Sequence, residues 1–182
     1  MEMHRVRRRA LGLLEEYKDG PLGEDAVREI FTDGGWDGRD HPGAELCHWM
    51  LWKLGCRDSR ILSRSVPEAR IARADDAFQK LHRGAQRLGA WQNFVLDSVP
   101  KPGDIVLTGN RTRGEQERAR ILVAADGPRA WRVMDAWTDA RDRLVLSRST
   151  VEVRGETLVR PGGRELLAGW VDLLLVLGDE LG

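Results

Sequence analysis

Residues 42–55 read Pro-Gly-Ala-Glu-Leu-Cys-His-Trp-Met-Leu-Trp-Lys-Leu-Gly and are the most distinctive stretch of the sequence. Pro42 suits the first turn of a helix, and Gly55 suits the position just after its end. Apolar side chains occupy nearly every face of the helix between them, which is typical of a helix buried inside a domain. We therefore predict a central, buried helix over residues 42–54.

Helices and strands separate along the chain. Helical spacing of apolar residues predicts further helices over 4–18, 23–32 and 68–87. Beyond Pro100, short apolar runs between Gly, Asp and Asn turns predict strands over 104–107, 121–125, 131–134, 144–146, 151–153 and 171–177. Helices first and strands later predict an α+β fold with an antiparallel sheet. We expect residues 1–182 to form a single domain, with a mainly helical half (1–99) and a mainly strand half (100–182).

Composition and charge limit the partners of the chain. Its 182 residues are 41% hydrophobic and 32% charged, as in a globular protein, and 29 basic residues balance 29 acidic ones. A zero net charge argues against a nucleic-acid partner, which needs a surplus of Lys and Arg on one face. No apolar run is long enough for a membrane helix or a classical signal peptide. We expect a soluble protein without membrane insertion, cytoplasmic as synthesised, with export by a non-classical route left open.

Neither a disulfide nor a metal site is expected. Cys47 and Cys56 lie nine residues apart, on different faces of the predicted helix or just after it, and they are too few to build a zinc site. The loop before the central helix holds four candidate metal ligands, but turn chemistry explains its acidic and Gly residues better than calcium binding does. We predict no metal and no cofactor. These loop residues are Asp33, Asp37, Asp40 and His41.

Two motifs together resemble a known family. Residues 42–55 resemble the active-site helix of the CHAP and NlpC-type cysteine peptidases, which cleave amides in cell-wall peptides. Residues 100–106, Pro-Lys-Pro-Gly-Asp-Ile-Val, resemble the turn that leads into the first strand of that family's barrel-like sheet. Gly89-Ala-Trp91 and residues 119–123 resemble further elements in the same order. The resemblance covers about residues 22–177 and implies a papain-like fold, with N-terminal helices packed on an antiparallel, partly barrel-like sheet.

The resemblance also shows where this sequence departs from the family. In the family, a Cys at the helix N-terminus attacks the amide, and a His on the adjacent strand acts as the base. The nucleophile position falls here on Gly43, and the histidine position falls near Arg118 or Ala119. No histidine follows His82. The resemblance therefore implies a domain that has lost its catalytic pair.

An alternative arrangement uses other residues. Cys47 lies one helical turn after Gly43, so Cys47 with His41 is the fallback catalytic pair; His48, adjacent to Cys47, points elsewhere on the helix. Since free Cys is among the most buried residue types, a core role for Cys47 is the simpler interpretation. Asp135 lies near the family's third catalytic position but has no His to orient, and a turn or surface role is the simpler one.

Candidate binding residues follow from the same comparison. Aromatic rings suit sugar or peptide contacts, and of the seven Trp residues we expect Trp36 and Trp137 to be exposed. The predicted binding residues are Trp36, Gly43, Asp104 and Trp137. A mixed-charge patch is interpreted as solvated surface, with a partner interface as the alternative. Its members are Glu115, Glu117, Arg118 and Arg120.

The functional hypothesis is a catalytically inactive CHAP/NlpC-like domain. It would serve as a cell-wall-peptide-binding module, or as a structural or assembly module in a larger particle such as a phage tail-like assembly. The competing hypothesis is an active peptidoglycan amidase or endopeptidase with displaced catalytic residues. An unrelated α+β interaction protein is the third.

Overall fold

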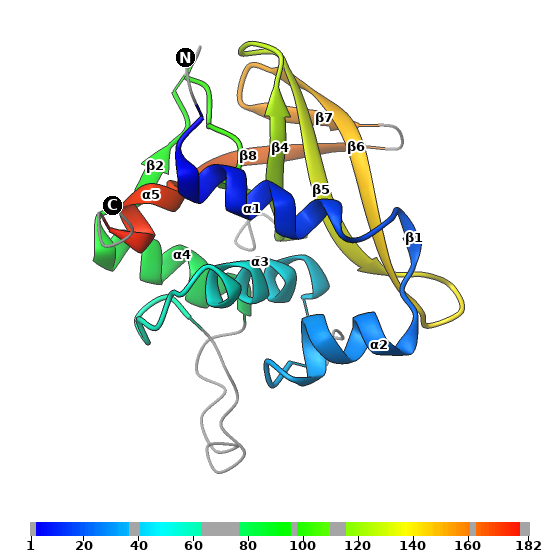
Figure 1. Ribbon diagram of the computed structural model, residues 1–182. Coiled ribbons are helices and arrows are strands. Elements are labelled where there is room, and N and C mark those ends of the chain that lie inside the picture. Colours follow the sequence, from blue (N-terminus) through cyan, green and yellow to red (C-terminus); the bar gives the residue numbers. More distant parts are fainter. Residues whose placement is uncertain are drawn as a thin grey trace.

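The computed structural model describes residues 3–36, 41–62, 77–95, 98–109, 116–160 and 163–178. Within these ranges the chain forms an antiparallel β-barrel with helices packed against one side of it (Figure 1). The predicted α+β class and the antiparallel sheet are therefore confirmed.

Six consecutive strands form the barrel. Each strand pairs with the next in antiparallel fashion, and β8 pairs with β3, so the sheet closes on itself. Closure leaves no free edge between these six strands. Two short strands extend the sheet: β1 (Gly20–Pro21) pairs with β6, and β2 (Trp91–Asn93) pairs with β8. The barrel strands are β3 (Ile105–Thr108), β4 (Arg118–Ala125), β5 (Ala130–Thr138), β6 (Leu144–Arg154), β7 (Thr157–Arg160) and β8 (Gly163–Val171).

The helices make up a layer against one side of the barrel. The predicted central helix is present as α3, which packs on β4 and β5 and is flanked by α4 (Figure 1). Nine of its twelve residues are buried, as its all-round apolar pattern predicts. The helices are α1 (Arg5–Glu15), α2 (Glu24–Val27) with a π-helical continuation η1 (Arg28–Thr32), α3 (Pro42–Lys53), α4 (Ala77–Leu88) and α5 (Leu173–Leu177).

Two hydrophobic clusters divide the core. The larger one lies between the helices and the outer face of the barrel and includes Leu46, Trp49 and Met134. The smaller one fills the barrel, because alternate residues of a strand face opposite sides of a sheet. Its buried members are Val106, Leu122, Trp131, Val133, Val151, Val153, Leu158, Leu167 and Trp170.

The Pro-Gly-Asp turn before β3 anchors the N-terminal helix. The buried Arg7 of α1 donates a 2.6 Å hydrogen bond to Asp104, and it also reaches Asp172 at 3.2 Å. Asp104 accepts further hydrogen bonds from the amides of Lys101 and Leu173. Asp104 is therefore fully occupied in joining α1, β3 and α5.

Several element boundaries differ from the predicted ones. Residues 144–146 and 151–153 belong to one strand, β6, and β7 was not predicted. The predicted strand over 171–177 is wrong, since β8 ends at Val171 and α5 follows. Asp172 starts this helix by accepting a hydrogen bond from the Leu174 amide. A short apolar run does not separate strand from helix by its periodicity. Of the helix predicted over 68–87, residues 68–76 lie outside the described ranges.

Candidate functional site

One end of the barrel is polar. On every barrel strand the inward-facing residues are apolar in one part and hydrophilic towards one end of the barrel. On β4, for example, the inward-facing Leu122 is preceded by Arg120 and Arg118, which face the same side. These positions lie together because the six strands run alternately up and down. The polar end comprises Thr108, Arg118, Arg120, Asp135, Ser147, Ser149, Arg160 and Glu165.

A cavity of about 600 Å³ opens at this polar end, between the barrel and the first turn of α3. Its wall combines three arginines, two serines and an exposed Trp with the start of the helix. Pockets of this size hold ligands of a few residues or sugar rings. The lining includes His41, Pro42, Gly43 and Ala44 from the helix side, and Arg118, Arg120, Asp135, Trp137, Ser147, Ser149 and Arg160 from the barrel side.

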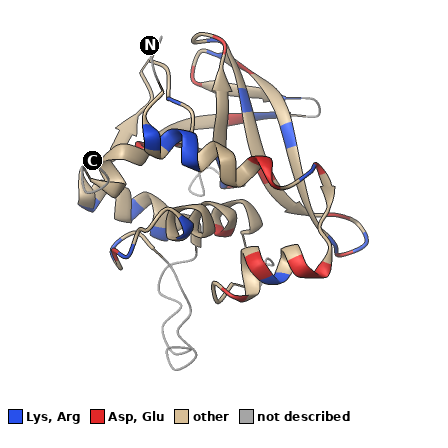
Figure 2. Cartoon of the chain, in the orientation of Figure 1, with Lys and Arg blue, Asp and Glu red and all other residues tan. Residues whose placement is uncertain are grey.

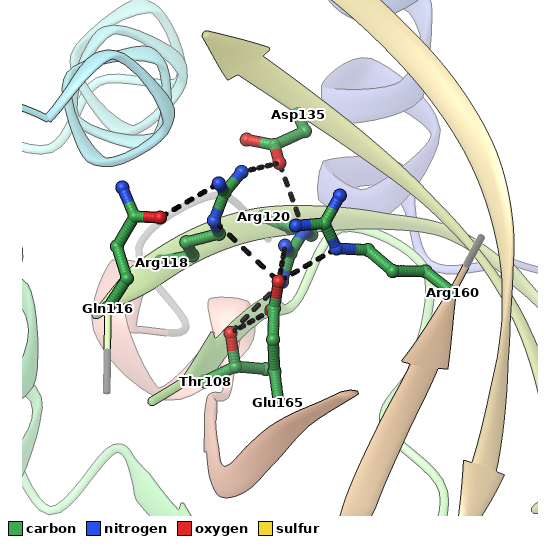
Figure 3. A network of polar contacts seen from close by, with 7 residues as sticks. All are labelled: Thr108, Gln116, Arg118, Arg120, Asp135, Arg160 and Glu165. Carbon is green, nitrogen blue, oxygen red and sulfur yellow. Dashed lines mark hydrogen bonds and ion pairs between the residues drawn. The ribbon is translucent and has the colours of Figure 1, made fainter. Parts of the chain in front are cut away.

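Arg120 organises the floor of the cavity (Figure 3). Its side chain is 2% exposed and donates to both Glu165 oxygens, at 2.6 and 2.9 Å. The same guanidinium donates to Asp135 at 3.0 Å and to the Thr108 hydroxyl at 3.0 Å. A buried Arg charge is tolerated when it is paired and when, as here, each of its three nitrogens donates a hydrogen bond.

The two carboxylates differ in how well their charge is stabilised. Burial opposes the charged form of Glu165, but four hydrogen bonds, from Arg120, Thr108 and Arg160, outweigh it and lower its pKa to about 2. Asp135 accepts one hydrogen bond, from Arg120, and burial raises its pKa despite the nearby arginines. Burial also opposes the charge on Arg120, yet its hydrogen bonds to Glu165 and the charge of Asp135 raise its pKa.

Gly43 lies where α3 touches the barrel. A Cβ atom at this position would come within 2.4 Å of the Ala119 carbonyl oxygen and 2.8 Å of Asp135 Oδ1. Gly43 therefore lies at the start of the central helix and beside β4, as predicted. The contact is so close that only Gly fits without a shift of the helix or the strand. A cysteine side chain therefore has no room at this position, which the resemblance assigns to the nucleophile.

The fallback catalytic residue is not built for nucleophilic attack. Cys47 is unpaired and buried, with no exposed surface, and burial raises the pKa of its thiol well above the usual value. The predicted core role of Cys47 is therefore confirmed. Since the thiolate is the nucleophile, burial and a raised pKa both disfavour nucleophilic attack by this cysteine.

The histidines near the helix have separate roles. Burial lowers the pKa of His48 to about 4, so its ring is neutral, and its Nε2 donates to the Ala77 carbonyl at 2.8 Å. Trp36 stacks on this ring, with 6.1 Å between ring centroids. His41 precedes α3 and lies half-buried at the cavity wall.

The other predicted binding residues have mixed outcomes. Trp137 is 40% exposed and lines the cavity, as expected. Trp36 is only 8% exposed, so its predicted exposure is wrong, because its ring packs on His48. Asp104 lies in the buried ion pair with Arg7 and is not among the described residues that line the cavity.

The charged patch on β4 is not a uniform surface either. Arg120 is buried, which contradicts its assignment to a solvated patch. Glu117, the residue before β4, accepts a hydrogen bond from Gln79 of α4. Glu115 lies outside the described residues. The contributions of Thr108, Arg160 and Glu165 were not predicted, although the alternation of polar residues in the strands was visible.

Basic residues cover the first turns of α1, whereas both signs of charge mix elsewhere (Figure 2).

In the described part of the chain, no group of three His, Cys, Asp or Glu side chains is arranged to hold a metal ion. Asp37 and Asp40 of the candidate loop lie outside that part. No described helix is long and apolar enough to cross a membrane.

Comparisons with known proteins give no further guidance. No protein-family model, no curated protein and no solved structure matches the chain. The geometry of the polar barrel end is therefore the basis for the functional argument.

Proposed function

We propose that this chain is a non-catalytic, papain-like module of the CHAP/NlpC type that binds a cell-wall peptide. The observation that carries the proposal is Gly43, which occupies the nucleophile position of the resemblance and has no space for a side chain. A cavity with convergent polar groups lies directly beside it. The cavity supports a binding role, and the lack of space for a side chain at Gly43 supports a non-catalytic one.

The chemistry of amide cleavage by cysteine hydrolases supports the same proposal. It requires a thiolate and a base within hydrogen-bonding reach of each other. Cys47 is buried with a raised pKa, and Cys56 is buried with a raised pKa as well. Arg118 and Ala119 stand where the base is expected. Neither residue type acts as a general base at neutral pH, since Arg stays protonated and Ala has no titratable group.

The test uses purified peptidoglycan and the natural chain. We expect the protein to sediment with the insoluble polymer and to release no peptides detectable by mass spectrometry. The matched control is Cys47→Ala, which should sediment to the same extent. Sustained peptide release that disappears in Cys47→Ala, with the fold intact by circular dichroism, would establish the competing hypothesis of an active hydrolase. Absence of sedimentation would contradict the binding role.

A further inference from the structure

Two arginines at the barrel mouth have hydrogen-bond donors that no described residue accepts. Arg118 donates to Gln116 at 2.9 Å, and its nearest carboxylates, Asp135 and Glu165, lie 3.7 and 3.6 Å away, beyond hydrogen-bonding distance. Arg160 donates through Nε to Glu165 at 2.9 Å. Its terminal nitrogens make no hydrogen bond to a described residue. Each guanidinium carries five N–H groups, so several remain available in the cavity.

The charges on this side of the cavity do not cancel. Arg118, Arg120 and Arg160 face Asp135 and Glu165, so three positive charges meet two negative ones (Figure 3). Glu117 also contributes to the wall, but it is not part of this ion-pair network, and its carboxylate accepts a hydrogen bond from Gln79 of α4. One positive charge is in excess, and the two accessible arginines, with side chains 25% and 34% exposed, carry it. This excess matches a monoanion.

The rest of the wall suits a peptide. Ser147 and Ser149 line the cavity and supply hydroxyls that both donate and accept hydrogen bonds. Trp137 offers an exposed ring on which an apolar part of a ligand can pack. The volume of about 600 Å³ accommodates more than an inorganic ion.

We propose that the barrel mouth binds the free carboxyl end of a short peptide, with Arg118 and Arg160 as the two residues that hold the carboxylate. This inference rests on the proposed binding function and adds the chemical group that is recognised. Arg120 acts indirectly: it fixes Glu165, which in turn positions Arg160. Arg is suited to this role because its planar donors match the two oxygens of a carboxylate.

The experiment is isothermal titration of the full chain with a synthetic cell-wall stem peptide that ends either in a carboxylate or in a primary amide. We expect the amide to bind at least about tenfold more weakly, since charge-assisted hydrogen bonds are lost. In Arg118→Gln the affinity for the acid falls, and the ratio between acid and amide approaches one. Arg132→Gln is the matched control, because Arg132 is an exposed arginine on the outer face of β5.

The outcomes separate the two proposals. Equal affinity for acid and amide, or an unchanged ratio in Arg118→Gln, would overturn the carboxylate site even if the protein still sediments with peptidoglycan. Inorganic phosphate that displaces the acid peptide at a lower concentration than acetate does would also overturn it, in favour of a phosphate site. If the protein neither bound the stem peptide in the titration nor sedimented with peptidoglycan, the proposed binding function itself would be contradicted.

Discussion

The two ends of the barrel are built from the same six strands but are filled in opposite ways. At one end Trp131 and Val133 of β5 belong to a closed apolar cluster; four residues on from Trp131, Asp135 joins an ion-pair network. The apolar end is packed with buried side chains, while the polar end retains a cavity and charged groups. A small barrel can therefore use one end for stability and the other for recognition, with strand alternation carrying both.

The largest effect should come from the apolar end. Trp131 is fully buried, and Trp131→Ala would leave a large void inside the barrel. We expect the free energy of unfolding to fall by about 3–5 kcal/mol, from lost burial and the remaining cavity. Urea unfolding followed by circular dichroism measures this. A loss below about 1 kcal/mol would mean that the barrel interior is not tightly packed.

Arg120 provides the corresponding test at the polar end. Arg120→Met removes the cation that pairs with the buried Asp135 and the partly buried Glu165. We expect a loss of about 3 kcal/mol, at the lower limit for breaking a buried ion pair, because Arg118 lies within 3.7 Å of both carboxylates.

The control for this variant is Arg132→Met, which changes an exposed arginine on β5. Its unfolding free energy should stay within about 0.5 kcal/mol of the wild type. Equal effects of the two substitutions would show that the network contributes no more than a surface charge.

Acid should weaken the polar end through Glu165. The folded-state pKa of Glu165, about 2, lies below its ordinary value of 4.5. The stabilisation is therefore fully present above about pH 4.5 and is lost as the pH falls towards 2. Its full size is roughly 3 kcal/mol by linkage. Asp135 acts in the opposite sense, since its raised pKa favours the folded state as the pH falls.

A Glu165→Gln variant isolates this effect. It should be less stable than the wild type at neutral pH, and the difference between the two proteins should shrink between pH 4.5 and 2. Urea unfolding at several pH values gives the comparison. A constant difference across this range would contradict the assigned pKa of Glu165.

The sequence predicts the apolar features of the molecule better than the polar ones. The helix over 42–54 could be predicted because its apolar pattern and its Pro and Gly boundaries all agree. The polar barrel end could not, because Arg120 and Glu165 lie 45 residues apart and meet only when β8 closes onto β3. Isolated charges in a strand look like surface residues until the closure of the sheet is known.

The same limit applies to single residues. Trp36 follows a Gly-rich loop, which suggests exposure, but a tertiary contact with His48 buries it. The apolar run after Val171 forms a helix because Asp172 caps its first turn, a local signal that the strand interpretation overlooked. Asp104 belongs to a Pro-Gly-Asp motif that is easy to find in the sequence. Its partner Arg7 lies 97 residues away, so the ion pair between them could not be predicted from the motif.

Apart from the Arg132→Met control, the smallest effect on stability should come from Trp137, which faces the same side of β5 as Trp131 but lies at the open end. Its side chain is 40% exposed, so Trp137→Ala should lower the free energy of unfolding by less than about 1 kcal/mol. The same substitution removes the exposed ring at the cavity wall and should weaken binding of the stem peptide. A matched pair of variants, Trp131→Ala and Trp137→Ala, therefore separates the two ends: the first changes urea unfolding, and the second changes the titration. If Trp137→Ala destabilised the protein as much as Trp131→Ala, both ends would be structural, and the division between a packed end and a recognising end would be wrong.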